Sequence, residues 1–173
     1  MRTTLLRGLL PGVTDLPPLR GVAVFVVGEQ LNSSKTDQDR LACTGTFMQA
    51  LCRLAGIRNH VVYLRAASMR RNLFQPGQAL NAEDAAANAE VLLAHFARYQ
   101  EHYGEEVKER QVLLCGAWAA RAFGQRGEYG RASVPGGAVT WIPHPSGRNY
   151  FYNKPENRDR IGHLLNLVFA HAL

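Results

Sequence analysis

Cysteine is scarce in this sequence, and its arrangement excludes several classes of protein. The three cysteines, Cys43, Cys52 and Cys115, are odd in number, lie far apart and form no CxxC pair. This pattern argues against a disulfide framework and against a zinc site. We therefore expect free, buried thiols in a reducing compartment, and we expect neither a metal nor a cofactor.

Long apolar segments are also absent. No stretch approaches the roughly 18 consecutive apolar residues of a membrane-spanning helix. The amino-terminal MRTTLLRGLLPG is too short and too weakly apolar for a signal peptide. We expect a soluble, cytoplasmic protein without a membrane partner.

Acidic residues are outnumbered by basic ones, with 14 Asp and Glu against 20 Lys and Arg and a formal net charge of +6. This surplus favours a polyanionic partner such as nucleic acid. The hydrophobic fraction of 46% and the charged fraction of 20% are ordinary for a globular protein. At 173 residues the chain predicts one domain, residues 1–173, and we expect a monomer.

Short apolar runs alternate with helical patterns along the chain. Strands are expected at 22–27, 60–64, 112–115 and 138–142, helices at 37–56, 81–103, 117–123 and 155–172, and irregular loops at 65–76 and 126–137. This alternation predicts right-handed βαβ units and a three-layer α/β/α domain with a central, mostly parallel four-stranded sheet. In such sheets ligands bind at the carboxyl ends of the strands.

Polar residues follow the first expected strand. Gly28 allows the backbone to turn sharply and to approach a ligand closely. The residues after it carry carboxylate, amide and hydroxyl groups: Glu29, Gln30, Asn32, Ser33 and Ser34. These groups either line a site or form a polar loop that caps the next helix.

The fourth expected strand ends in a histidine between two prolines, Pro143 and Pro145. A lone histidine is more often structural than catalytic, but prolines hold the backbone of His144 extended at a strand end, which favours a functional role.

The residues after this histidine suit nucleic acid. Ser146, Gly147 and Arg148 offer a hydroxyl group, close backbone approach and a bidentate phosphate donor. Asn149 and Tyr150 follow, and the tyrosine is suited to base stacking or to wedging into a duplex. Alternatively, Tyr150 and the two aromatic residues after it, Phe151 and Tyr152, pack the last helix against the sheet.

Two arginines, Arg70 and Arg71, lie in the loop that is expected after the second strand. They are candidates for phosphate binding, although a solvated basic loop explains them equally well.

These segments resemble the signatures of the uracil-DNA glycosylase superfamily. HPSGRN at 144–149 is similar to the second signature, which reads HPSPRN in the single-strand-selective branch. GEQ at 28–30 resembles the first signature, and VLLCGAWAARAFG at 112–124 resembles the third strand with its alanine-rich helix. All three segments occur in the order of the family.

The resemblance implies a DNA glycosylase fold and gives roles to individual residues. His144 would contact the extruded base and stabilise negative charge on its carbonyl oxygen. Glu29, Gln30 or Asn32 would place the hydrolytic water. This is coherent chemistry, because donors aimed at the departing base and a positioned water lower the barrier to N-glycosidic cleavage, and the base must leave the stack to be reached.

The sequence also departs from the family pattern. Leu31 replaces the usual proline, and Gln30 stands where several branches carry a catalytic Asp or Asn. With three cysteines, no four-cysteine iron–sulfur cluster is expected. The asparagine that usually follows the second strand and reads the uracil edge is missing at its expected place, since Asn72 comes several residues later.

These observations predict a monofunctional DNA glycosylase acting on a modified or damaged base rather than on plain uracil, in single- or double-stranded DNA. Two alternatives are a catalytically inactive nucleic-acid-binding protein of the same fold and a hydrolase of free nucleosides or nucleotides.

Overall fold

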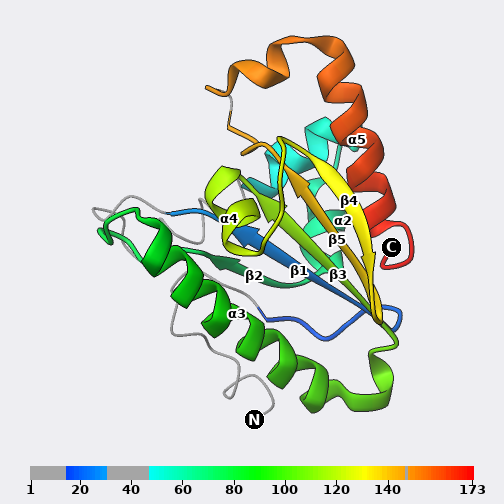
Figure 1. Ribbon diagram of the computed structural model, residues 1–173. Coiled ribbons are helices and arrows are strands. Elements are labelled where there is room, and N and C mark those ends of the chain that lie inside the picture. Colours follow the sequence, from blue (N-terminus) through cyan, green and yellow to red (C-terminus); the bar gives the residue numbers. More distant parts are fainter. Residues whose placement is uncertain (1–14, 31–46, 147) are drawn as a thin grey trace.

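A five-stranded, mostly parallel sheet forms the centre of the protein (Figure 1). The computed structural model describes residues 15–30, 47–146 and 148–173. The strands are β1 (Val22–Gly28), β2 (Ala67–Asn72), β3 (Glu109–Cys115), β4 (Gly130–Val134) and β5 (Gly137–Ile142), in the order β2-β1-β3-β5-β4. β2, β1, β3 and β5 run parallel, and β4 is antiparallel to β5.

Helices cover both faces of this sheet, so the predicted three-layer α/β/α class is confirmed. They are α2 (His60–Ala66), α3 (Ala82–Tyr103), α4 (Ala117–Ala122) and α5 (Pro155–Phe169), with two 3-10 turns at Gly104–Glu106 and Tyr150–Asn153 and a further helical segment at 47–54. Among the described residues, none of these helices is long and apolar enough to cross a membrane.

The continuous apolar run of β1 explains its place in the sheet interior, between β2 and β3. Every residue of β1 is buried, and alternate side chains enter two separate cores. On the α3 side, Phe25 stacks on Phe96 with ring centroids 4.4 Å apart. On the α2 and α5 side, Val24 and Val26 pack with Leu165. A strand buried on both faces needs this unbroken hydrophobicity.

The second strand lies later in the chain than the pattern predicts. Residues 60–64 are helical, because Asn59 caps the helix by accepting a hydrogen bond from the backbone N–H of Val61 at 3.0 Å. Val61 and Val62 remain 43% and 37% exposed, so this apolar run is not a buried strand. The expected loop at 65–76 instead contains β2, whose six residues are all buried despite their polarity.

The predicted count of four strands is also wrong, because β4 lies inside the expected loop at 126–137. Its sequence has no apolar run, and tertiary partners hold it in place. Arg131 Nη1 donates to Gln111 Oε1 at 3.0 Å and to Thr140 Oγ1 at 2.8 Å. The turn into β5 requires glycine, because Gly136 has φ +80° and a Cβ on Gly137 would overlap the backbone of Arg110.

The remaining elements agree with their predictions where the structure describes them; of the helix expected at 37–56, residues 47–54 are helical and residues 37–46 lie outside the described residues. The expected helix start at residue 81 is confirmed, since Asn81 Oδ1 accepts the backbone N–H of Asp84 at 2.8 Å. β3, α4, β5 and α5 form where the sequence predicts them, within a few residues. Because β1, β3 and β5 are parallel, the residues that follow their carboxyl ends meet at one edge of the sheet.

Candidate functional site

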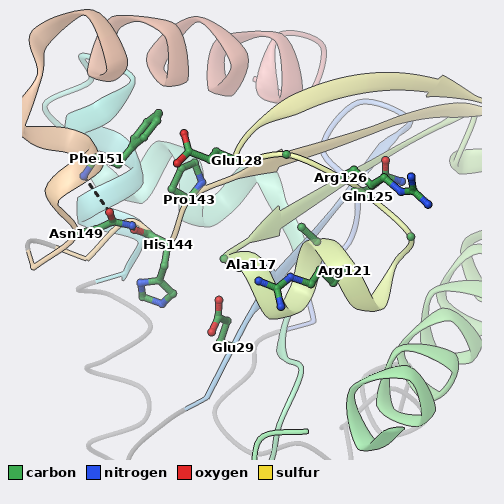
Figure 2. Close-up of a pocket in the computed structure, with 14 residues that line it drawn as sticks. Glu29, Ala117, Arg121, Gln125, Arg126, Glu128, Pro143, His144, Asn149 and Phe151 are labelled. Atoms are coloured by element: carbon green, nitrogen blue, oxygen red, sulfur yellow. Dashed lines mark hydrogen bonds between the residues drawn. The ribbon is translucent and has the colours of Figure 1, made fainter. Parts of the chain in front are cut away.

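A cavity of about 940 Å³ opens at the carboxyl ends of the parallel strands (Figure 2). Its walls come from the residue after β1, from α4 with the loop that follows it, and from the segment after β5. The lining residues are Glu29, Gly116, Ala117, Ala120, Arg121, Gly124, Gln125, Arg126, Gly127, Glu128, Pro143, His144, Asn149 and Phe151.

Glu29 reaches the cavity across the beginning of α4. A Cβ on Gly116 would overlap the Glu29 carboxylate, and Gly116 has φ +111°, so this close approach depends on glycine. Burial raises the pKa of Glu29 above its usual value, while a hydrogen bond from the backbone N–H of Trp118 and the charge of Arg121 act against this shift. Glu29 is thus a half-buried carboxylate that takes up a proton more readily than an exposed one.

His144 enters the same cavity from the segment after β5. Burial lowers the pKa of His144, and the positive charge of Arg70 lowers it further. The imidazole is therefore neutral at pH 7, with one nitrogen able to donate a hydrogen bond and the other able to accept one. Figure 2 shows Glu29, His144 and Arg121 directed toward a common space at this end of the cavity.

The HPSGRN segment is held by hydrogen bonds within itself and to its neighbour. Asn149 Nδ2 donates to the His144 carbonyl at 3.2 Å, and Asn149 Oδ1 accepts the backbone N–H of Phe151 at 3.1 Å. Tyr152 donates its hydroxyl proton to the Pro143 carbonyl. These hydrogen bonds fix the position of the backbone at Pro143 and His144. Asn149 therefore holds the histidine in place and also lines the cavity.

The side chains predicted to bind nucleic acid after His144 differ in their surroundings. Ser146 Oγ accepts the backbone N–H of Arg148 at 3.2 Å. Arg148 is exposed, and Tyr150 is 85% exposed, so both can reach a partner. Gly147 lies outside the described residues, as do Asn32, Ser33 and Ser34.

Gln30 is not brought to the cavity. Its Nε2 donates to the carbonyl oxygens of Gln75 at 2.9 Å and Gln78 at 2.7 Å. Both hydrogens of this amide group are therefore used to fasten the segment after β1 to the segment after β2. Of the three candidates to place a water, Glu29 lines the cavity, Gln30 does not, and Asn32 lies outside the described residues.

The expectation that both arginines lie on a phosphate-binding loop is wrong, because they lie within β2. Arg71 is fully buried, and its Nη1 lies 2.8 Å from Asp15 Oδ1 while its Nη2 donates to Oδ2 at 3.0 Å. Arg70 is 5% exposed and lies over the ring of Phe47. Burial and the Asp15 pair make Arg71 inaccessible to a phosphate at the surface.

Asn72 lies closer to the second strand than the sequence pattern indicates. Because β2 is Ala67–Asn72, Asn72 is its last residue and pairs in register with Gly28 of β1. Asn72 is buried, and its Oδ1 lies next to Gly28.

Three charged residues of the cavity wall, Arg121, Arg126 and Glu128, were not among the candidates that the sequence suggested. Arg121 follows Ala117 by four residues, so both lie on one face of α4. Within the described part of the chain, no group of three or more His, Cys, Asp or Glu side chains could hold a metal ion.

No model of a known protein family matches the chain, and no curated protein matches it either. The resemblance to uracil-DNA glycosylases therefore remains a prediction from short motifs, and the function must be argued from the cavity.

Proposed function

We propose that this protein is a monofunctional DNA glycosylase that flips a modified or damaged base out of DNA and hydrolyses its N-glycosidic bond. One observation carries the proposal: Glu29 and His144 extend from the ends of two different parallel strands into one cavity. A carboxylate and a neutral imidazole in one cavity are the two groups that this hydrolysis needs.

The chemistry assigns each group a task. When the glycosidic bond breaks, its electron pair moves to the base nitrogen, and negative charge spreads to the base carbonyl. Neutral His144 donates a hydrogen bond to that carbonyl, where charge develops. Glu29 orients a water molecule and accepts its proton as the oxygen adds to the sugar carbon.

The size of the cavity supports a base that carries a substituent. Its volume of about 940 Å³ is near the top of the range of about 300–1,000 Å³ that holds drug-sized ligands, which are larger than a bare pyrimidine. Ala117 and Gly124 have small or no side chains and leave room for a substituent at the wall formed by α4 and the loop after it. Arg121 can donate hydrogen bonds to polar groups of the base, and Glu128 can accept them. The sequence favoured a modified base because an asparagine seemed to be missing after the second strand. Asn72 is the last residue of β2, so the preference for a modified base now depends on the volume of the cavity.

DNA as the partner is supported by exposed groups beside the cavity. Tyr150 offers an aromatic face for stacking, and the neighbouring Arg148 offers a phosphate donor. The net charge of +6 favours association with a polyanion.

The test is an abasic-site assay on identical oligonucleotides that carry uracil, hydroxymethylated or glucosylated pyrimidines, hypoxanthine or xanthine. We expect excision of a substituted base, about 100-fold slower in His144→Ala, as for the loss of one oxyanion-type donor. Glu29→Gln should keep DNA binding and lose most cleavage. Glu156→Gln, which makes the same charge change at an exposed position on α5, is the matched control and should be fully active.

Other outcomes would select other functions. DNA binding without abasic sites on any substrate would identify a non-catalytic binding protein. Release of bases from free nucleosides or nucleotides, but not from oligonucleotides, would identify a nucleoside hydrolase. Excision of uracil above all other bases would contradict the argument from the cavity volume.

A further inference from the structure

Two consecutive arginines in the interior of a strand are unusual, and here they face opposite sides of the sheet. Successive strand residues alternate between faces. Arg71 pairs with Asp15, near His95 on the α3 side. Arg70 lies on the other side, among residues at the carboxyl ends of the strands.

Arg70 contacts a neighbour of His144. Its Cζ lies 4.3 Å from the ring centroid of Phe47, and the Phe47 ring meets the His144 ring edge-on with centroids 5.9 Å apart. Arg70 Nη2 lies 3.5 Å from Asn72 Oδ1, at the limit of a hydrogen bond. The guanidinium group of Arg70 and the ring of His144 thus both contact Phe47.

Arginine keeps its charge at every pH at which a protein folds. At 5% exposure, the charge of Arg70 acts through protein rather than through water, and it is therefore screened less than a surface charge. The pKa of His144 already responds to it, since Arg70 adds to the lowering caused by burial. The electrostatic influence of Arg70 thus extends to His144, which lines the cavity.

We propose that Arg70 is a positioning residue whose buried positive charge stabilises the anion that the base becomes as its glycosidic bond breaks. This inference rests on the proposed glycosylase function. In the step concerned, the bond's electron pair leaves with the base, water supplies a hydroxyl group to the sugar carbon, and the water's proton goes by way of Glu29 to neutralise the released base. Arg70 acts on this charge separation without contacting the sugar or the water.

Such a charge matters most for bases that leave poorly. A base whose released nitrogen is weakly acidic carries more negative charge in the transition state and gains more from a nearby cation. Arg70→Met should therefore slow excision of a poor leaving group by about 30-fold and slow excision of an electron-poor, fluorinated analogue of the same base much less. Arg70→Lys keeps the charge and should restore most of the rate.

The matched control is the double variant Asp15→Asn, Arg71→Met. It removes the neighbouring buried arginine of the same strand, together with its partner, on the face away from His144. We expect its rates to change by the same factor for both leaving groups. Thermal unfolding of each variant identifies losses that come from reduced stability alone.

A second measurement does not depend on activity. NMR titration of the His144 imidazole should show that Arg70→Met raises the pKa of His144, while the double variant leaves it unchanged. The other described charged groups at this cavity, Glu29, Arg121, Arg126 and Glu128, and nearby Cys115 and Tyr152, are the same in all variants.

The outcomes separate the two proposals. A parent protein that excises no base refutes the glycosylase function, and with it the role of Arg70 in base departure, whereas the His144 titration still decides whether Arg70 acts on His144. Equal rate losses for both leaving groups in a folded Arg70→Met variant, or an unchanged pKa of His144, would overturn the inference.

Discussion

Removing the side chain of Arg71 tests how this fold tolerates a charged strand in its interior. The pair between Arg71 and Asp15 has two N–O contacts of 2.8 and 3.0 Å, and the exposed fractions of the two side chains are 0% and 4%. Arg71→Met leaves the Asp15 carboxylate buried without this guanidinium. Breaking such a pair from one side costs about 3–5 kcal/mol, and we expect a loss of that size in the free energy of unfolding.

The magnitude can be measured in two ways. For a domain of this length, about 3–5 kcal/mol corresponds to a fall in Tm of roughly 6–20 °C. Urea unfolding, followed by circular dichroism and by the fluorescence of Trp118 and Trp141, gives the free energy directly. Because the pair is buried, the loss should change little between low and high salt.

A double-mutant cycle completes this test. The double variant Asp15→Asn, Arg71→Met leaves no buried charge at this position, so it should be more stable than the sum of the two single losses predicts. Additive losses, or a loss below about 1 kcal/mol for Arg71→Met, as for an exposed pair, would refute the reasoning. β2 would then be held by its pairing with β1 and by its apolar contacts.

Three further predictions concern the cavity and its partner. The rate of excision should fall as the pH is lowered, with an apparent pKa above 4.5, because burial raises the pKa of the Glu29 carboxylate and this group must be ionised to accept a proton. A pH–rate profile whose acid limb has an apparent pKa at or below 4.5 would exclude Glu29 as the base. Ala117→Leu, at an exposed position of the cavity wall, should slow excision of substituted bases at least 10-fold more than excision of a bare base, and equal effects in the oligonucleotide assay would show that the substituent lies elsewhere. Arg148→Gln should reduce the slope of log affinity against log salt by roughly one, as measured by fluorescence anisotropy, and an unchanged slope would remove Arg148 from the phosphate contacts.

Local patterns sufficed wherever a segment's own residues decided its structure. The apolar run of β1, the Asn81 cap of α3 and the Gly116 stop after β3 each predict an element that the structure contains. The candidate pair Glu29 and His144 was also predictable, because each follows an expected strand and parallel strands end at the same edge.

Tertiary contacts decided the rest. Burial of β2 depends on Asp15, which is 56 residues from Arg71 along the chain, and pairing of β4 depends on Gln111 and Thr140. Neither segment has an apolar pattern of its own, so no local signal could identify it as a strand. The positions of Asn72, Gln30 and Arg70 have the same cause. A polar side chain can be buried only where distant segments supply its partners, and those partners meet only in the folded chain.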